Sequence, residues 1–206
     1  MIISKHFEDS EILQADMMDI VKRFPDNHFD CLVTDCPYRI SSGGSTGHDS
    51  FLRTDKKNLQ SGRLFEHNEI EFSDWLPEVY RVLKSKSHAY IMVNGRNLSK
   101  LQSDAESVGF RFQNLLVWKK NNQTPNRYYM QQAEFILMLR KGKARNINSM
   151  GISNILEVPV VINRHHPTQK PIELMQILIE NSTNQGNVVL DPFAGSGTTG
   201  LACMRS

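Results

Sequence analysis

The sequence predicts an α/β protein built on a doubly wound, mostly parallel sheet. Short apolar runs alternate with amphipathic segments along the 206 residues, which is the pattern of parallel strands joined by helices. Two of these runs end at an acidic residue that is followed by a loop, and the second loop is rich in glycine. Ligands of such sheets bind at the carboxyl ends of the strands. We therefore expect both loops to open onto one crevice.

The first part of the chain, up to residue 83, supplies two strands and two helices. Residues 12–15 are a short apolar run, and a helix over 17–23 follows. Residues 29–34 are rich in β-branched and aromatic residues and precede Asp35, so they predict a strand that delivers its end to a loop. Residues 40–68 are rich in Gly and Ser and predict a long loop. Ser73 is expected to cap a helix with one apolar face, which consists of Leu76, Val79, Tyr80 and Leu83.

The second half continues the alternation. A strand is expected over 88–93, and a helix over 98–108 that Gly109 ends. Two further strands are expected over 112–118 and 134–139. A helix over 171–181 has Pro171 near its start, and Thr168 can cap it. A strand over 188–190 leads through the glycines into a last helix over 198–204. The sequence shows no internal repeat.

Composition places the chain in a broad class. Its length suits a single domain over residues 1–206. Three cysteines without a C-x-x-C pair argue against a disulfide framework and a structural zinc site, and the adjacent His165 and His166 lack a third ligand, so no metal site is expected. The start of the sequence does not resemble a signal peptide, and no apolar run is long enough for a transmembrane helix. We expect a cytoplasmic protein without a membrane partner.

Charge is unevenly distributed. The formal charge is −7 over residues 1–80, +10 over 81–145 and −1 over 146–206, which leaves +2 in all. A basic central third indicates a polyanionic partner, and nucleic acid is the first candidate. A solvated basic surface would give the same composition.

The glycine-rich stretch reads DPFAGSGTTG and begins at Asp191. Gly195, Gly197 and Gly200 fit G-x-G-x-x-G between a strand and a helix, which favours a bound ligand over a plain tight turn. Asp191 can accept a hydrogen bond from an ammonium group. This suits a cofactor that carries an amino acid better than a diphosphate.

Three motifs together resemble the S-adenosylmethionine-dependent DNA amino-methyltransferases of the permuted β class. DPFAGSGTTG resembles their cofactor motif, DCPY at residues 35–38 resembles the catalytic D-P-P-Y, and HPTQKP at 166–171 resembles the segment before the cofactor motif. The order of the three is that of the β class. The resemblance covers nearly the whole chain outside 40–68. It implies a Rossmann-like class I methyltransferase fold, S-adenosyl-L-methionine as cofactor and a bacterial or phage origin.

The resemblance also assigns cofactor contacts. It gives Thr168, Gln169 and Lys170 to the methionine end of the cofactor and Asp16 to the adenine, although Asp16 can equally serve as a helix N-cap. The remaining cofactor-binding candidates lie in the glycine-rich motif: Asp191, Phe193, Gly195, Ser196, Gly197 and Thr198.

The catalytic motif suits transfer to an amino nitrogen. An exocyclic amino group is a poor nucleophile because its lone pair is delocalised into the ring. The Asp35 carboxylate and the Cys36 carbonyl would accept its two N–H groups and favour the reactive form. Tyr38 offers a stacking face for an extruded base, and Pro37 stiffens the turn. A plain strand-ending turn is the alternative.

Cys36 stands where the family has proline. A covalent cysteine mechanism belongs to methylation at cytosine carbon-5, whose pattern is Pro-Cys and not Cys-Pro. We therefore expect Cys36 to act through its main chain.

The basic third supplies the candidates for binding double-stranded DNA. They are Lys119, Lys120, Arg127 and Lys141, and the aromatic side chains among them can stack on nucleotides. Residues 142–164 are too few for a separate target-recognition domain.

The sequence also stops within the helix after the glycines, before the strand whose terminal acid would bind the cofactor ribose. This predicts a truncated chain with weak cofactor binding.

The leading hypothesis is a site-specific methyltransferase acting on the N6 amino group of a flipped adenine. Adenine is favoured because the motif begins with Asp. Cytosine-N4 transfer and a catalytically inactive remnant that binds nucleic acid are the alternatives, and a homodimer is left open.

Overall fold

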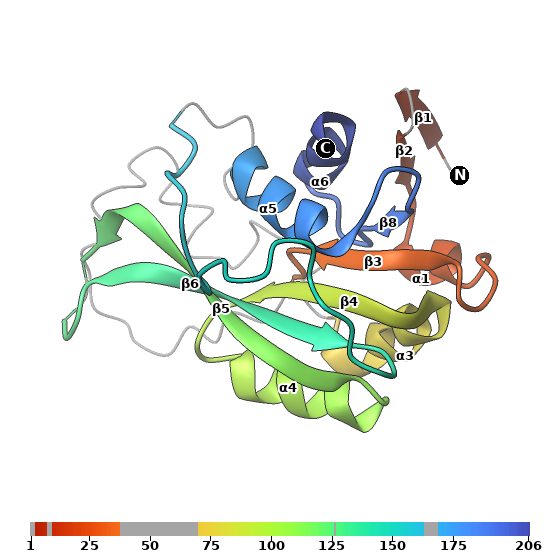
Figure 1. Cartoon of the computed structure of the whole chain (residues 1–206), viewed down its shortest axis with the longest axis horizontal. Coiled ribbons are helices and arrows are strands. Elements are labelled where there is room, and N and C mark those ends of the chain that lie inside the picture. Colours follow the sequence, from red (N-terminus) through yellow and green to blue (C-terminus); the bar gives the residue numbers. More distant parts are fainter. Residues whose placement is uncertain (1–2, 8–9, 38–69, 126, 163–168) are drawn as a thin grey trace, which may run out of the picture.

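A six-stranded sheet lies between two layers of helices, with a separate two-stranded sheet beside it (Figure 1). The structure is a computed structural model that describes residues 3–7, 10–37, 70–125, 127–162 and 169–206. The predicted loop over 40–68 lies outside these residues. The strands are β1 (Ile3–Phe7), β2 (Ser10–Gln14), β3 (Phe29–Thr34), β4 (Leu83–Val93), β5 (Arg111–Thr124), β6 (Gln131–Arg140), β7 (Ile155–Glu157) and β8 (Val189–Leu190). The helices are α1 (Met17–Val21), α3 (Phe72–Val82), α4 (Leu98–Ser107), α5 (Ile172–Ser182) and α6 (Thr198–Arg205).

The strand order of the large sheet is β7-β5-β6-β4-β3-β8. Strands β4, β3 and β8 are parallel neighbours, as are β5 and β7, whereas β6 runs antiparallel to both β4 and β5. The exception has a local cause, because β5 and β6 are joined directly as a hairpin, and a hairpin requires antiparallel strands. The doubly wound, mostly parallel class I methyltransferase fold expected from the sequence is confirmed.

Two apolar cores form, one on each face of the sheet. Trp75, Leu76 and Leu101 from α3 and α4 pack on one face, with Leu32 and Leu137 of the sheet. The opposite core packs α5 and α6 against the sheet through Tyr90, Ile136, Leu174, Leu178 and Ala202. Alternate residues of β6 enter different cores, as the twofold repeat of a strand requires. The expected helices on both faces are confirmed.

Two predicted helix caps are wrong. Helix α3 is capped by Glu71 and not by Ser73, because Glu71 and Asp74 form a reciprocal capping box in which the Glu71 N–H donates to the Asp74 carboxylate at 3.0 Å. Helix α5 has Pro171 as its N-cap, so Thr168, which lies outside the described residues, is too early to cap it. Strand β7 was missed because its three residues carry too little pattern for a prediction.

The run at 12–15 belongs to the small sheet. Strand β2 pairs antiparallel with β1, with Ile12 opposite Lys5. Strand β2 is therefore not part of the six-stranded sheet. Its Ile12 Cδ1 nevertheless lies 3.3 Å from the position that a Cβ would take on Gly197, which places β2 beside the glycine-rich loop.

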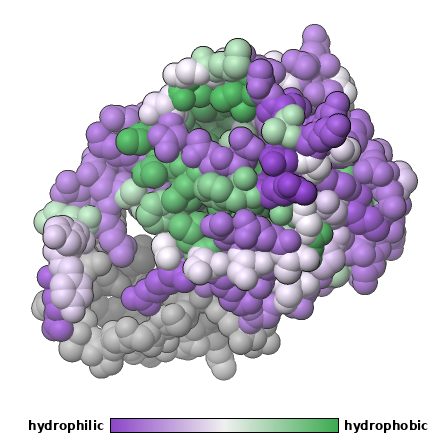
Figure 2. All heavy atoms as spheres, turned by 60° about the horizontal axis from the view of Figure 1, so that its bottom comes forward, coloured by the Kyte–Doolittle hydropathy of each residue, from purple (hydrophilic) through white to green (hydrophobic). Residues whose placement is uncertain are grey.

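The face shown in Figure 2 is mixed in polarity. On this side, apolar residues gather in the middle and hydrophilic residues surround them.

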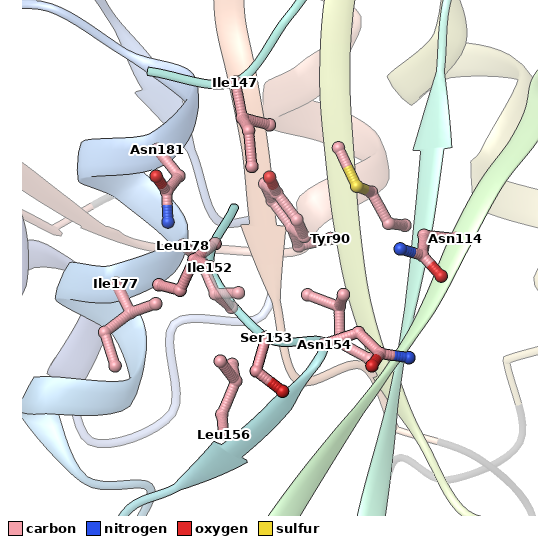
Figure 3. Close-up of a pocket in the computed structure, with 12 residues that line it drawn as sticks. Tyr90, Asn114, Ile147, Ile152, Ser153, Asn154, Leu156, Ile177, Leu178 and Asn181 are labelled. Carbon is pink, nitrogen blue, oxygen red and sulfur yellow. The ribbon is translucent and has the colours of Figure 1, made fainter. Parts of the chain in front are cut away.

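A cavity of about 60 Å³ lies between α5, β4–β6 and residues 147–156, with Tyr90, Asn154 and Leu178 among its lining residues (Figure 3). None of the predicted site residues lines it. In the described residues no helix combines the length and the apolar character that a membrane span needs.

A buried polar cluster ties β4 to the end of α5. The Nδ1 atom of His88 lies 2.8 Å from Ser182 Oγ, and the Tyr90 hydroxyl lies 2.7 Å from the same oxygen. Arg145 donates to the Ser182 carbonyl. His88 is 1% exposed, and its burial, together with the charge of Arg145, lowers its pKa from 6.5 to about 4. The imidazole is therefore neutral in the folded protein near pH 7.

This cluster should make stability fall as the pH falls below about 6.5. Between that pH and about 4 the unfolded chain binds a proton at His88 that the folded chain rejects. The shift corresponds to a loss on the order of 3 kcal/mol of unfolding free energy across that window. Denaturant melts of the parent and His88→Gln at pH 4.5 and 7.0 test this. Gln does not titrate, so the variant should lose this part of the pH dependence. An equal pH dependence in both proteins would show that His88 titrates normally.

Candidate active site

The acidic residues that end β3 and β8 lie at the same edge of the sheet. The two strands are parallel neighbours, with Leu32 opposite Leu190. Asp35 directly follows Thr34, the last residue of β3, and Asp191 follows Leu190, the last residue of β8. The two loops therefore leave the sheet side by side, as the sequence predicted.

Asp191 holds this edge together. Its Oδ1 accepts hydrogen bonds from the Thr34 hydroxyl at 2.7 Å and from the Phe193 N–H at 3.1 Å. Its Oδ2 accepts one from the Thr199 hydroxyl at 2.5 Å. Burial raises the pKa of this carboxyl group, and the three donors act in the opposite direction. The carboxylate thus links β3, the glycine-rich loop and the start of α6.

The glycine-rich loop has the backbone that a close ligand approach requires. Gly195 and Gly197 adopt positive φ angles of 52° and 76°, which glycine tolerates better than other residues. Gly197 is the N-cap of α6, so the first N–H groups of that helix, which have no partner within it, face the loop. The hydroxyls of Ser196 and Thr198 lie 2.9 Å apart. Gly195 and Ser196 are exposed, and a Cβ on Gly200 would meet no atom within 4 Å.

The other residues predicted to bind the cofactor differ in how buried they are and in what they contact. The Phe193 ring meets Trp75 edge to face, with centroids 5.2 Å apart, and packs against the core of α3 and α4. Asp16 is exposed and caps α1, because its carboxylate accepts the Met18 N–H at 2.8 Å. Gln169 lies within the described residues, just before Lys170.

Asp35 is joined to the segment before α5 by an ion pair. Lys170 Nζ lies 2.6 Å from Asp35 Oδ2 and 3.6 Å from Glu134 Oε2. Lys120 Nζ lies 3.3 Å from the other oxygen of Glu134. Charges of opposite sign therefore alternate from β3 to the β5–β6 hairpin. Burial raises the pKa of the Asp35 carboxyl group and the charge of Lys170 lowers it.

Cys36 points into the protein. Its side chain is 2% exposed and its Sγ lies 3.8 Å from the Met92 carbonyl. Burial, reinforced by the charge of Asp35, raises the pKa of the thiol well above its usual range. Because the thiolate is the nucleophilic form, this environment opposes covalent catalysis by Cys36. Pro37 is half-buried, and Tyr38 lies outside the described residues.

The basic residues fall into two groups. Lys119, Lys120 and Arg127 belong to the β5–β6 hairpin, which projects from the sheet (Figure 1). Lys119 pairs with Glu157 at 2.9 Å, whereas Arg127 is exposed at the hairpin end. Lys141 instead donates to the Tyr80, Arg81 and Leu83 carbonyls at the end of α3. Its ammonium group thereby has a structural task, and its predicted contact with DNA stays a prediction.

Three participants were missed in the sequence. Thr34 and Thr199 hold Asp191, and Glu134 contacts Lys170. A hydroxyl residue just before a strand-ending acid is a weak signal, since threonine is common in strands. The sequence signal for Glu134 was clearer, because it is one of three acidic residues in the basic stretch 81–145.

Known proteins share this architecture. The chain is 29% identical to the Type II methyltransferase M2.MboI of Moraxella bovis, over 98% of this chain and 83% of that protein. It is 28% identical to the Type II methyltransferase M2.DpnII of Streptococcus pneumoniae, over 94% of this chain and 80% of the other.

Among solved structures, the complex of M1.HpyAVI with SAM superposes with a TM-score of 0.67 at 27% identity, covering 93% of this chain and 86% of that one. The cytosine-N4-specific PvuII DNA methyltransferase gives a TM-score of 0.68 at 17% identity, covering 93% and 76%, and shows the fold alone. The family model described as DNA methylase matches residues 29–206. The chain therefore belongs to the DNA methylase family of N6 and N4 amino-methyltransferases.

Proposed function

We propose that this methyltransferase transfers a methyl group from S-adenosyl-L-methionine to the N6 amino group of a flipped adenine in double-stranded DNA. The observation that carries the proposal is the position of Asp35. Its carboxylate ends β3 beside the glycine-rich loop, so an acceptor for an amino group lies next to a loop suited to a cofactor. The choice of adenine is supported by the aspartate at the start of the catalytic motif.

The glycine-rich loop fits the cofactor. Exposed Gly195 and Ser196, the positive φ at Gly197 and the start of α6 give a surface of small residues and N–H donors. Asp191 shapes this loop through its three hydrogen bonds. Asp16 and Gln169 are proposed to contact the cofactor at its two ends. When bound, S-adenosyl-L-methionine supplies an electrophilic methyl group on a sulfonium ion.

The catalytic segment activates the amino nitrogen by accepting hydrogen bonds from its two N–H groups. The Asp35 carboxylate accepts one N–H group and the Cys36 carbonyl accepts the other, which localises the lone pair on nitrogen. Tyr38 is proposed to stack on the extruded base. The thiol of Cys36 takes no part, since its burial keeps it protonated.

The hairpin β5–β6 supplies the proposed DNA surface. Tyr128 and Tyr129 are 85% and 91% exposed at its end, beside Arg127. Exposed aromatic and guanidinium groups can contact bases and phosphates. Lys119 and Lys120 lie farther along the hairpin, where acidic partners offset their charges.

Nucleoside mass spectrometry after incubation with DNA and cofactor tests the proposal. N6-methyladenine is the expected product. N4-methylcytosine would instead support the cytosine alternative, and the absence of both would support an inactive remnant that binds nucleic acid.

Replacing Asp35 by Asn should lower the methylation rate about 100-fold or more, because loss of one preorganised catalytic hydrogen-bonding group has effects of this size. Cofactor affinity and thermal midpoint should change little. Cys36→Ser is the matched variant at the adjacent position and should retain most activity. Single-turnover methylation measures both. Near-parental turnover in Asp35→Asn, or loss of all turnover in a folded Cys36→Ser protein, would contradict the assigned roles.

DNA affinity should decrease steeply with salt, because binding to phosphates releases counterions. Arg127→Gln should reduce the slope of log K against log salt by about one unit for one lost phosphate contact. Lys100→Gln removes one charge from α4, where Lys100 pairs with Asp104 at 2.7 Å, and should leave the slope unchanged. Fluorescence anisotropy at several salt concentrations gives both slopes, and equal slopes for the two variants would remove Arg127 from the DNA surface.

A further inference from the structure

Lys170 occupies a position that the proposed reaction needs for its substrate. Its ammonium group donates to Asp35 Oδ2 at 2.6 Å, and the side chain of Lys170 is only 12% exposed. An ammonium group and an exocyclic amino group are both N–H donors to the same carboxylate. Lys170 therefore imitates the contact that the target base would make with Asp35.

The reaction is disfavoured while Lys170 stays in this place. A cation on Asp35 weakens the carboxylate as an acceptor for a second donor. It also repels the positive charge of a sulfonium ion and the positive charge that develops on the attacking nitrogen. Repulsion of this kind is strong in a partly buried site, where solvent screens little.

The structure provides a second position for the ammonium group. Glu134 Oε2 is 3.6 Å from Lys170 Nζ, which is already within ion-pair distance, and the lysine stem is flexible. Lys120 holds the other Glu134 oxygen at 3.3 Å and lies 6.0 Å from the Trp118 ring centroid. Glu134 is itself 33% exposed. An anchored carboxylate other than Asp35 thus lies within reach of Lys170.

We propose that Lys170 moves from Asp35 to Glu134 when the target amino group arrives, so that Glu134 is a positioning residue for methyl transfer. The proposal rests on the proposed function, because the arriving group is the amino group of a base. Until that group arrives, the ammonium group of Lys170 compensates the charge of the half-buried Asp35 carboxylate. Afterwards the Lys170 charge stays in the site but no longer contacts the reacting atoms.

The test compares Glu134→Gln with Glu157→Gln. Both remove one carboxylate paired with a hairpin lysine, but Glu134 pairs with Lys120 and Lys170 whereas Glu157 pairs with Lys119. Glu134→Gln should lower the turnover number about tenfold or more, which corresponds to weakening one charged hydrogen bond. Its calorimetric cofactor affinity should stay within about twofold of the parent, since the glycine-rich loop is unchanged. Glu157→Gln should match the parent in both.

A spectroscopic readout separates this role from a structural one. The ammonium NMR signal of Lys170, assigned with Lys170→Arg, should shift in the parent when S-adenosylhomocysteine and a methylatable oligonucleotide bind together. It should shift much less in Glu134→Gln. An unshifted signal in the parent would overturn the proposal without any Glu134 variant, as would a turnover of Glu134→Gln within about twofold of the parent. A parent protein that methylates no DNA would instead contradict the proposed function.

Discussion

The carboxylate of Asp191 is the interaction on which the site depends. It accepts hydrogen bonds from Thr34 at the end of β3, from the Phe193 N–H in the glycine-rich loop and from Thr199 in α6. Residues 157 positions apart in the sequence are thereby fixed at one edge of the sheet. Without this link the parallel pairing of β3 and β8 would still align the strands, but the two loops that follow them would be free to separate. A buried carboxylate with three donors is costly to rearrange.

Charge compensation is the second organising feature. Asp35 and Asp191 end neighbouring strands, and burial raises the pKa of each carboxyl group. The two are stabilised differently. Asp191 is satisfied by neutral hydroxyl and amide donors that belong to the fold, whereas Asp35 is satisfied by the charge of Lys170. A donor on a long side chain can be displaced by a substrate, and donors fixed in the fold cannot. This difference is consistent with a structural role for Asp191 and with the catalytic role proposed for Asp35.

The sequence predicted the fold well where strong local patterns existed. Strand β3 was predicted with its observed bounds, because its apolar run ends sharply at Asp35. Helices α4, α5 and α6 were predicted to within about two residues. The cap of α3 was not, since Ser73 and Glu71 are both plausible caps and only the reciprocal bonds of Glu71 and Asp74 decide between them. Strand β2 pairs with the neighbouring β1, and its position beside the glycine-rich loop depends on tertiary packing, which no local pattern encodes.

The convergence of the two loops was predicted from their motifs, but the contacts between their side chains were not. The convergence of the Asp35 and Asp191 loops follows from the general rule for strand ends in parallel sheets. The inward role of Lys141 and the contact of Glu134 with Lys170 depend on side chains that meet across the fold. The composition shows only that Lys141 and Glu134 lie in a basic stretch. It does not show which lysines of that stretch point inward and which are exposed.

A crystal structure of the protein with S-adenosylhomocysteine and a methylatable oligonucleotide tests the central claim most directly. We expect S-adenosylhomocysteine to bind on the loop of Gly195–Gly197. We expect the amino group of an extruded adenine to donate a hydrogen bond to Asp35. Cofactor bound at another edge of the sheet, or an extruded base that does not contact Asp35, would contradict it.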